Sequence, residues 1–302
     1  MPQDITPIKI ANIKPYLALT GGIIFLGFSG IFVTWANAPG TVTGFYRMGI
    51  AALVLLVPFI LRRRGSAKLP RKEVLVALFG GLLFAFDLFF FNTGVLMSGA
   101  LNPTLMGNTA PLWVAIGAIL IFRERLLTPF WIGLGIAMLG AFIILSVDTI
   151  RDFTLGLGTF FGLLAGMFYG GYFLVTERGR RTMDSLSYFW IVVASSSIIM
   201  LIVSLIFRQP IFGYSGKTYL SFLGLGLVSQ VLGQFSFSYA LGFLPASFVA
   251  PAGLGQPVVT AILVIPLLGQ HLSFLQIIGG TAVLVGIYLV HRSRLPTAPP
   301  LA

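Results

Sequence analysis

The 302-residue chain is 57% hydrophobic and only 9% charged, whereas soluble globular domains are about 25% charged. These proportions exclude a soluble protein, and the lack of cysteine excludes disulfides, thiolate metal sites and cysteine nucleophiles. The net charge of +11 would suit a nucleic-acid partner, but the basic residues lie between apolar stretches, so we interpret them as a topology signal and expect no nucleic acid.

Apolar stretches of about 20 residues recur along the chain, and each is long enough to cross a bilayer core of about 30 Å. We therefore predict an all-α membrane protein that contacts the lipid bilayer along its whole length, with no room for a soluble domain. The ten expected helices are Tyr16–Ala36, Thr41–Leu61, Val74–Met97, Leu101–Phe122, Pro129–Val147, Gly156–Thr176, Ser187–Phe207, Tyr219–Leu241, Ala246–Leu268 and Leu272–Val290.

Basic residues are distributed unevenly over the two sides of this arrangement. Fifteen of the 19 Lys and Arg residues fall on the side of the N-terminus and three on the opposite side, while Arg47 lies inside a helix. Because cytoplasmic loops carry the excess of Lys and Arg, we expect both termini in the cytoplasm. The first apolar stretch is too long for the core of a signal peptide, so we treat it as a retained helix.

The chain repeats itself after 146 residues. At that spacing Gly107 falls on Gly253 and Pro111 on Pro257, and Gly133 and Gly140 likewise coincide with two later glycines, Gly279 and Gly286. The distance covers five helices, an odd number, so the second copy must enter the membrane from the opposite face. We therefore predict two inverted five-helix repeats, residues 1–147 and 148–302, which is an architecture of alternating-access transporters.

The loops after the fourth and ninth helices agree with this inversion. Arg123-Glu124-Arg125 lies on the basic side, whereas its counterpart, Gly269-Gln270-His271, carries no permanent charge.

The repeat resembles the EamA-type unit of the drug/metabolite transporter superfamily, over essentially the whole chain. The resemblance rests on a proline-bearing fourth helix (Pro111), a closing turn (Phe122-Arg123-Glu124) and a glycine-rich fifth helix, with a weaker second copy around Pro257 and Leu268-Gly269-Gln270. Arg47 also fits the family pattern. Arg123 and Gln270 depart from the Leu-Gly-Glu-like turn, which puts a role for that turn in doubt.

Within the superfamily, the length and aromatic content are most similar to the YddG amino-acid exporters. The resemblance implies a multi-pass protein of the bacterial plasma (inner) membrane that is not an enzyme and uses no cofactor or metal. A monomer would be compatible with it, although the sequence leaves the oligomeric state open.

The two prolines indicate where a substrate would bind. A proline inside a helix frees the carbonyl four residues earlier, here at Gly107 and at Gly253. Irregular backbone at mid-membrane is tolerated where it is buried in protein or lines a wet cavity, and matching interruptions in two repeats point to a transporter's binding site. The alternative is a pair of packed kinks without a ligand.

Only Arg47 and Asp87 carry permanent charge inside the expected helices. Because an unpaired charge at the membrane centre costs about 2.5–3.5 kcal/mol, we predict an intramembrane ion pair between them. The alternative is that Arg47 extends outward while Asp87 accepts hydrogen bonds from hydroxyls such as Thr93 or Ser98. A free Asp87 would suit proton coupling, whereas a paired one favours facilitated or weakly coupled export.

Amides and aromatic rings complete the expected cavity. Gln230, Gln234 and Ser238 share one face of the eighth helix, and the resemblance implies that helices one, three, four, six, eight and nine line the centre. The predicted substrate-binding residues are Phe28, Phe84, Asp87, Phe91, Asn108, Tyr169, Gln230, Gln234 and Gln256, beside the broken backbone at Gly107, Pro111, Gly253 and Pro257.

A ladder of small residues marks the sixth helix: Gly158, Gly162, Gly166 and Gly170. Such a ridge lets helix backbones approach closely. We expect it to pack inside the monomer, with a dimer face as the alternative.

These observations favour an exporter of small metabolites, with amino acids of neutral or aromatic type, over a broad range, as the first candidates. A multidrug or cationic-amine exporter with Asp87 as counter-ion is the alternative. An intramembrane serine protease is a remote one, because Gly27-Phe28-Ser29-Gly30 has no histidine expected at its depth. An aspartyl protease would need a second carboxylate, and a channel would call for a ring of polar groups.

Overall fold

The computed structural model describes residues 13–65, 69–98, 101–146, 156–268 and 272–293. Within these ranges ten helical segments are long and apolar enough to cross a membrane, close to the predicted ones. They are Lys14–Ala36, Gly40–Arg63, Arg71–Ser98, Asn102–Phe122, Thr128–Ser146, Leu157–Arg180, Ser185–Ile206, Gly216–Ala240, Ala246–Leu267 and Phe274–Arg292.

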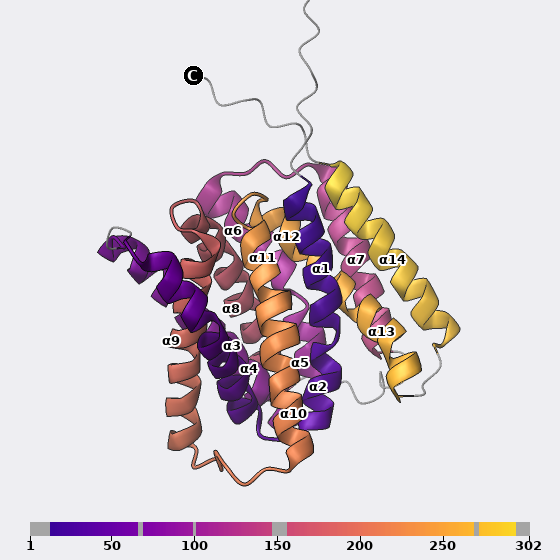
Figure 1. Cartoon of the computed structure of the whole chain (residues 1–302). Helices are drawn as coiled ribbons and strands as arrows, with labels where there is room; N and C mark the ends of the chain where they lie inside the picture. Colours follow the sequence, from indigo (N-terminus) through magenta and orange to yellow (C-terminus); the bar gives the residue numbers. More distant parts are fainter. Residues whose placement is uncertain (1–12, 66–68, 99–100, 147–155, 269–271, 294–302) are drawn as a thin grey trace, which may run out of the picture.

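Six of the ten spans are single helices and four are interrupted. The single helices are α3 (Gly40–Arg63), α4 (Arg71–Ser98), α7 (Thr128–Ser146), α8 (Leu157–Arg180), α9 (Ser185–Ile206) and α14 (Phe274–Arg292). The interrupted spans are α1–α2 (Lys14–Gly27, Ser29–Ala36), α5–α6 (Leu101–Gly107, Ala110–Phe122), α10–η2–α11 (Gly216–Gly224, Leu225–Gln234, Phe235–Ala240) and α12–α13 (Ala246–Gly253, Gly255–Leu268). Figure 1 shows α1 beginning and α14 ending at the same end of the bundle, here called the basic end.

Both predicted proline breaks are confirmed. The fourth span is interrupted between Gly107 and Ala110, and Pro111 stands in the first turn of α6, where its missing N–H leaves no donor unsatisfied. The ninth span is interrupted at Leu254, three residues before Pro257. The two interruptions are related by the 146-residue repeat.

Two further irregularities are not predicted by the sequence pattern. The first span breaks at Phe28, where the Gly27 carbonyl accepts a hydrogen bond of 2.7 Å from the Thr260 hydroxyl of α13. The eighth span contains a ten-residue π-helix, η2, and π-helical segments in α-helices frequently mark functional sites.

The contact between α7 and α14 shows how the two halves are related. A methyl group on Gly133 would lie 2.8 Å from the Gly286 carbonyl oxygen, and one on Gly140 would lie 2.5 Å from that of Gly279. The repeat shift exchanges these two contacts, because it carries Gly133 onto Gly279 and Gly140 onto Gly286. The fifth helices of the repeats therefore cross backbone to backbone and antiparallel, as inverted repeats require.

The glycine ladder of α8 packs inside the monomer, as expected. Added methyl groups would meet Ser98 at Gly158, Pro103 at Gly162, the Met106 carbonyl at Gly166 and Trp113 at Gly170. The ladder therefore begins against the end of α4 and then follows the broken fourth span, so that α8 lies against its interrupted backbone.

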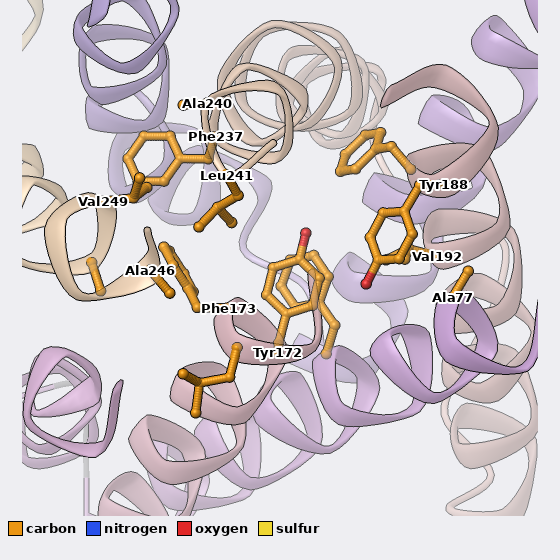
Figure 2. Packing of buried hydrophobic residues seen from close by; sticks show 14 of the residues in the cluster. Ala77, Tyr172, Phe173, Tyr188, Val192, Phe237, Ala240, Leu241, Ala246 and Val249 are labelled. Atoms are coloured by element: carbon orange, nitrogen blue, oxygen red, sulfur yellow. The ribbon is translucent and has the colours of Figure 1, made fainter. Parts of the chain in front are cut away.

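Buried side chains fill the space near the basic end. In Figure 2, Tyr172 and Phe173 of α8 lie among Tyr188 of α9, Phe237 of α11 and Ala246 of α12. These helices therefore close the bundle between the membrane centre and the basic end.

Two carboxylates accept hydrogen bonds from the start of α12 at this end. The Glu177 Oε2 atom accepts a hydrogen bond of 2.8 Å from the Ala246 backbone N–H, and the Ser247 hydroxyl donates one of 2.5 Å to Glu124 Oε2. A carboxylate is favourable beside the N-terminus of a helix. Glu124 therefore has a structural contact between the fourth and ninth spans.

Candidate functional site

A fixed guanidinium lies inside the bundle where the first, second and eighth spans meet. Arg47 of α3 donates from Nε to Gln230 Oε1 at 2.7 Å and from Nη1 to Ser29 Oγ at 3.2 Å. Gln230 belongs to the π-helix and is fully buried, and Ser29 follows the break in the first span. Irregular backbone in two spans thus positions both partners of Arg47.

Asp87 of α4 lies within electrostatic range of Arg47 and of Tyr169. Its side chain is half-buried, and no hydrogen bond joins its carboxylate to another described residue.

The predicted ion pair differs from what the structure shows. No ion pair within 4.0 Å joins Arg47 to Asp87, both of which are described residues, so the two side chains interact over a longer distance. A buried amide and a hydroxyl satisfy part of the guanidinium instead. The alternative partners of Asp87 are also engaged elsewhere, because Thr93 and Ser98 donate to carbonyls of their own helix.

Aromatic rings pack close to Asp87. Tyr169 of α8 donates a hydrogen bond of 3.3 Å to Gln234 Oε1. Phe84, one turn before Asp87, stacks on Tyr172 at 4.5 Å and on Tyr169 at 6.0 Å between ring centroids. The structure thus brings five predicted site residues into one cluster with Arg47: Phe84, Asp87, Tyr169, Gln230 and Gln234.

The buried amides of this cluster keep free donors. The Nε2 atoms of Gln230 and Gln234 have no hydrogen-bond partner, although their side chains are 0% and 1% exposed. Unsatisfied buried donors are rare in native proteins, so these two amides are unusual polar groups for the interior of a bundle.

The remaining predicted residues lie outside the cluster. The Asn108 amide donates to the Thr104 carbonyl of its own span, at 2.8 Å, and Phe28 stacks on Phe32. Phe91 lies beside Gly107, and Gln256 beside Gly253, each next to the broken backbone. In the described part of the chain no hydrogen bond or ring contact joins these four side chains to Arg47, Asp87 or Tyr169.

Two members of the cluster are not predicted as site residues. Tyr172 lies one turn after Tyr169, a spacing that places both on one helix face and could have identified it. The sequence pattern gives Ser29 a role only in the remote alternative of a serine protease. Its hydroxyl instead accepts from Arg47, and His291, the only histidine in the described ranges, lies against Tyr16 and Phe248.

A hollow of about 430 Å³ opens at the end of the bundle away from the basic end. It lies between α2 and α10, which run side by side in Figure 1, and Phe32, Trp35 and Lys217 are among its lining residues. Phe32 in turn stacks on Phe28 at the break. Its lining residue Phe32 thus links the hollow, by one ring contact, to the break in the first span.

Comparison with known proteins gives two matches to one family. The model of the "EamA-like transporter family" matches residues 13–146 and again residues 156–292. The join between the two predicted domains, at residues 147 and 148, lies outside the described residues.

Similar curated proteins are transporters of unknown substrate. "Uncharacterized transporter YdfC" of Bacillus subtilis is 25% identical over 87% of this chain and 89% of its own length. "Uncharacterized transporter YyaM" of the same organism is 23% identical over 91% and 93%, and an "Uncharacterized transporter" of Archaeoglobus fulgidus is 23% identical over 91% and 95%. A solved crystal structure with 14% identity superposes with a TM-score of 0.80 over 93% of this chain and 98% of that one, which supports the fold.

Proposed function

The chain belongs to the EamA-like transporter family, and from this premise we propose that it exports amino acids, neutral and aromatic ones above all, by alternating access through the Arg47–Asp87 cluster. We place it in a bacterial plasma membrane with both termini in the cytoplasm. One observation carries the substrate class: a guanidinium and a carboxylate inside the expected membrane spans lie within electrostatic range of each other without forming an ion pair.

The positive charge of Arg47 and the negative charge of Asp87 are not paired with each other, and this arrangement suits a zwitterionic substrate. Leaving each of them unpaired at mid-membrane is unfavourable by about 2.5–3.5 kcal/mol on insertion scales, and a molecule that carries both an ammonium and a carboxylate would compensate both at once. The half-buried ring of Tyr169, packed against the buried rings of Phe84 and Tyr172, provides an aromatic surface for its side chain. Phosphorylated sugars fit poorly, because they would call for several basic residues and, among the described residues, the cluster contains only Arg47.

A cationic-amine or drug exporter is the second candidate, and the half-buried Asp87 carboxylate favours it. In that case Asp87 alone would bind the substrate. Asp87→Asn would then abolish amine export and leave amino-acid export unaffected.

Efflux from proteoliposomes tests the proposal with a panel of labelled amino acids and amines, with and without a pH gradient. We expect Asp87→Asn and Gln234→Ala each to lower amino-acid export about tenfold or more, because hydrogen bonds to charged groups contribute about 1.5–3 kcal/mol. Ser236→Ala is the control, since this exposed hydroxyl on the same span bonds only to Leu232 of its own helix. Unchanged amino-acid export in both cluster variants would contradict the proposal.

A further inference from the structure

The Arg47 guanidinium uses only part of its hydrogen-bonding capacity. Of its five N–H donors, Nε and Nη1 each engage one side-chain oxygen, and no hydrogen bond joins Nη2 to a described residue. The side chain as a whole is half-buried. A planar guanidinium of this kind is suited to two-point binding of a carboxylate.

The hydrogen-bond partners of Arg47 hold its guanidinium in place without neutralising its charge. Gln230 and Ser29 are uncharged, so Arg47 keeps a full positive charge available to a ligand. An ion pair with Asp87 would have cancelled it. The Nε2 atoms of Gln230 and Gln234 are likewise uncharged, buried and without a hydrogen-bond partner among the described residues.

Asp87 and the aromatic rings provide the complementary contacts. The carboxylate of Asp87 lies within electrostatic range of Arg47 and is separated from it by more than 4.0 Å. Phe84, three residues earlier on α4, turns its ring toward Tyr172 and Tyr169. A guanidinium, a carboxylate and an aromatic ring, that of Tyr169, therefore lie in one cluster.

We propose, building on the proposed function, that Arg47 is the carboxylate-binding residue of the substrate site and that Ser29 and Gln230 position it. The substrate's ammonium group then lies at Asp87 and its side chain against Phe84 and Tyr169. This assigns a fixed orientation to the bound molecule and makes Arg47 the residue that distinguishes an amino acid from the corresponding amine.

Ligand-induced thermal stabilisation of the purified protein in detergent tests this assignment independently of export. The probes are L-phenylalanine, phenethylamine, which lacks the carboxylate, and 3-phenylpropionate, which lacks the ammonium group. We expect Arg47→Gln to weaken phenylalanine and 3-phenylpropionate at least tenfold while phenethylamine changes less than twofold. Asp87→Asn should give the converse pattern, weakening phenylalanine and phenethylamine but not 3-phenylpropionate.

Ser29→Ala tests the positioning role and guards against a variant that fails to fold. It removes one neutral hydrogen bond to Arg47, so we expect a severalfold loss for the two carboxylate probes and none for phenethylamine. Equal losses for all three probes in both Arg47→Gln and Ser29→Ala would overturn the assignment. If phenylalanine binds with this pattern yet is not exported by proteoliposomes, the proposed function fails and the carboxylate site stands.

Discussion

Arg47 and Asp87 show why the identity of a charged residue does not fix its partner. Both are identified from the sequence as the charges inside the membrane, and an ion pair is the expected outcome. The structure instead offers Arg47 a buried amide on the π-helix and a hydroxyl beside a helix break. Neither backbone irregularity has a proline to predict it at that position, so the partners of Arg47 could not be derived from spacing.

At the basic end, Asp184 lies outside the spans and is the N-cap residue of α9. Burial opposes its charged form, but the hydrogen bonds from Ser187 and the nearby charge of Arg62 outweigh this and hold the pKa of Asp184 below its usual value. A lowered pKa in the folded state means that the charged cap stabilises the protein above the unfolded pKa of about 3.9. That stability is lost as the pH falls through the lowered pKa.

We therefore expect Asp184→Ala to reduce stability by about 1 kcal/mol at pH 7, measured by thermal unfolding in detergent. The difference from the parent protein should shrink as the pH falls below the lowered pKa. Asp184→Asn, which keeps a capping oxygen, should lose much less. An Asp184→Ala deficit that does not change between pH 7 and acid would contradict the charge-based explanation.

Among the elements, the crossing of α7 and α14 depends on the absence of side chains. A methyl group at Gly140 would meet backbone atoms of α14, the Gly279 oxygen at 2.5 Å and the Val283 nitrogen at 2.7 Å, and neither can move aside without separating the helices. We expect Gly140→Ala to destabilise the protein by about 1–3 kcal/mol. Gly135→Ala in the same helix is the matched control, because nothing lies within 4 Å of its added methyl group.

Thermal unfolding of the two variants in the same detergent decides this prediction. A Gly135→Ala variant that loses as much stability as Gly140→Ala would show that helix flexibility, and not the close crossing, is what the glycines provide.

The sequence predicts elements well where a single residue dictates the backbone. Pro111 and Pro257 cannot continue a helix without losing a hydrogen bond, and both breaks are confirmed. The break at Phe28 depends on Thr260, more than 200 residues away, which bonds the Gly27 carbonyl. The π-helix similarly arises from packing, with Gly233 against Leu26 and Gly226 against Ile50, so neither could be found from local pattern.

At the scale of the whole molecule, the inverted repeat makes a topological prediction. The chain contains no cysteine, so single cysteines can be introduced at Arg123 and at Gln270. Gln270 is the repeat counterpart of Glu124 and lies outside the described residues. An impermeant thiol reagent should label residue 123 from the cytoplasmic face and residue 270 from the other face. Labelling of both from one face would refute the inversion and the orientation together.

The antiparallel crossing of α7 and α14 has a consequence for movement. Its two glycine contacts are interchanged by the symmetry that relates the repeats, so the crossing lies on the pseudo-twofold axis. If the inward-open and outward-open states are related by that same symmetry, the axis is unchanged between them and this crossing can persist throughout the cycle. Helices far from the axis would travel farthest, while α7 and α14 would serve as the stationary centre of rotation.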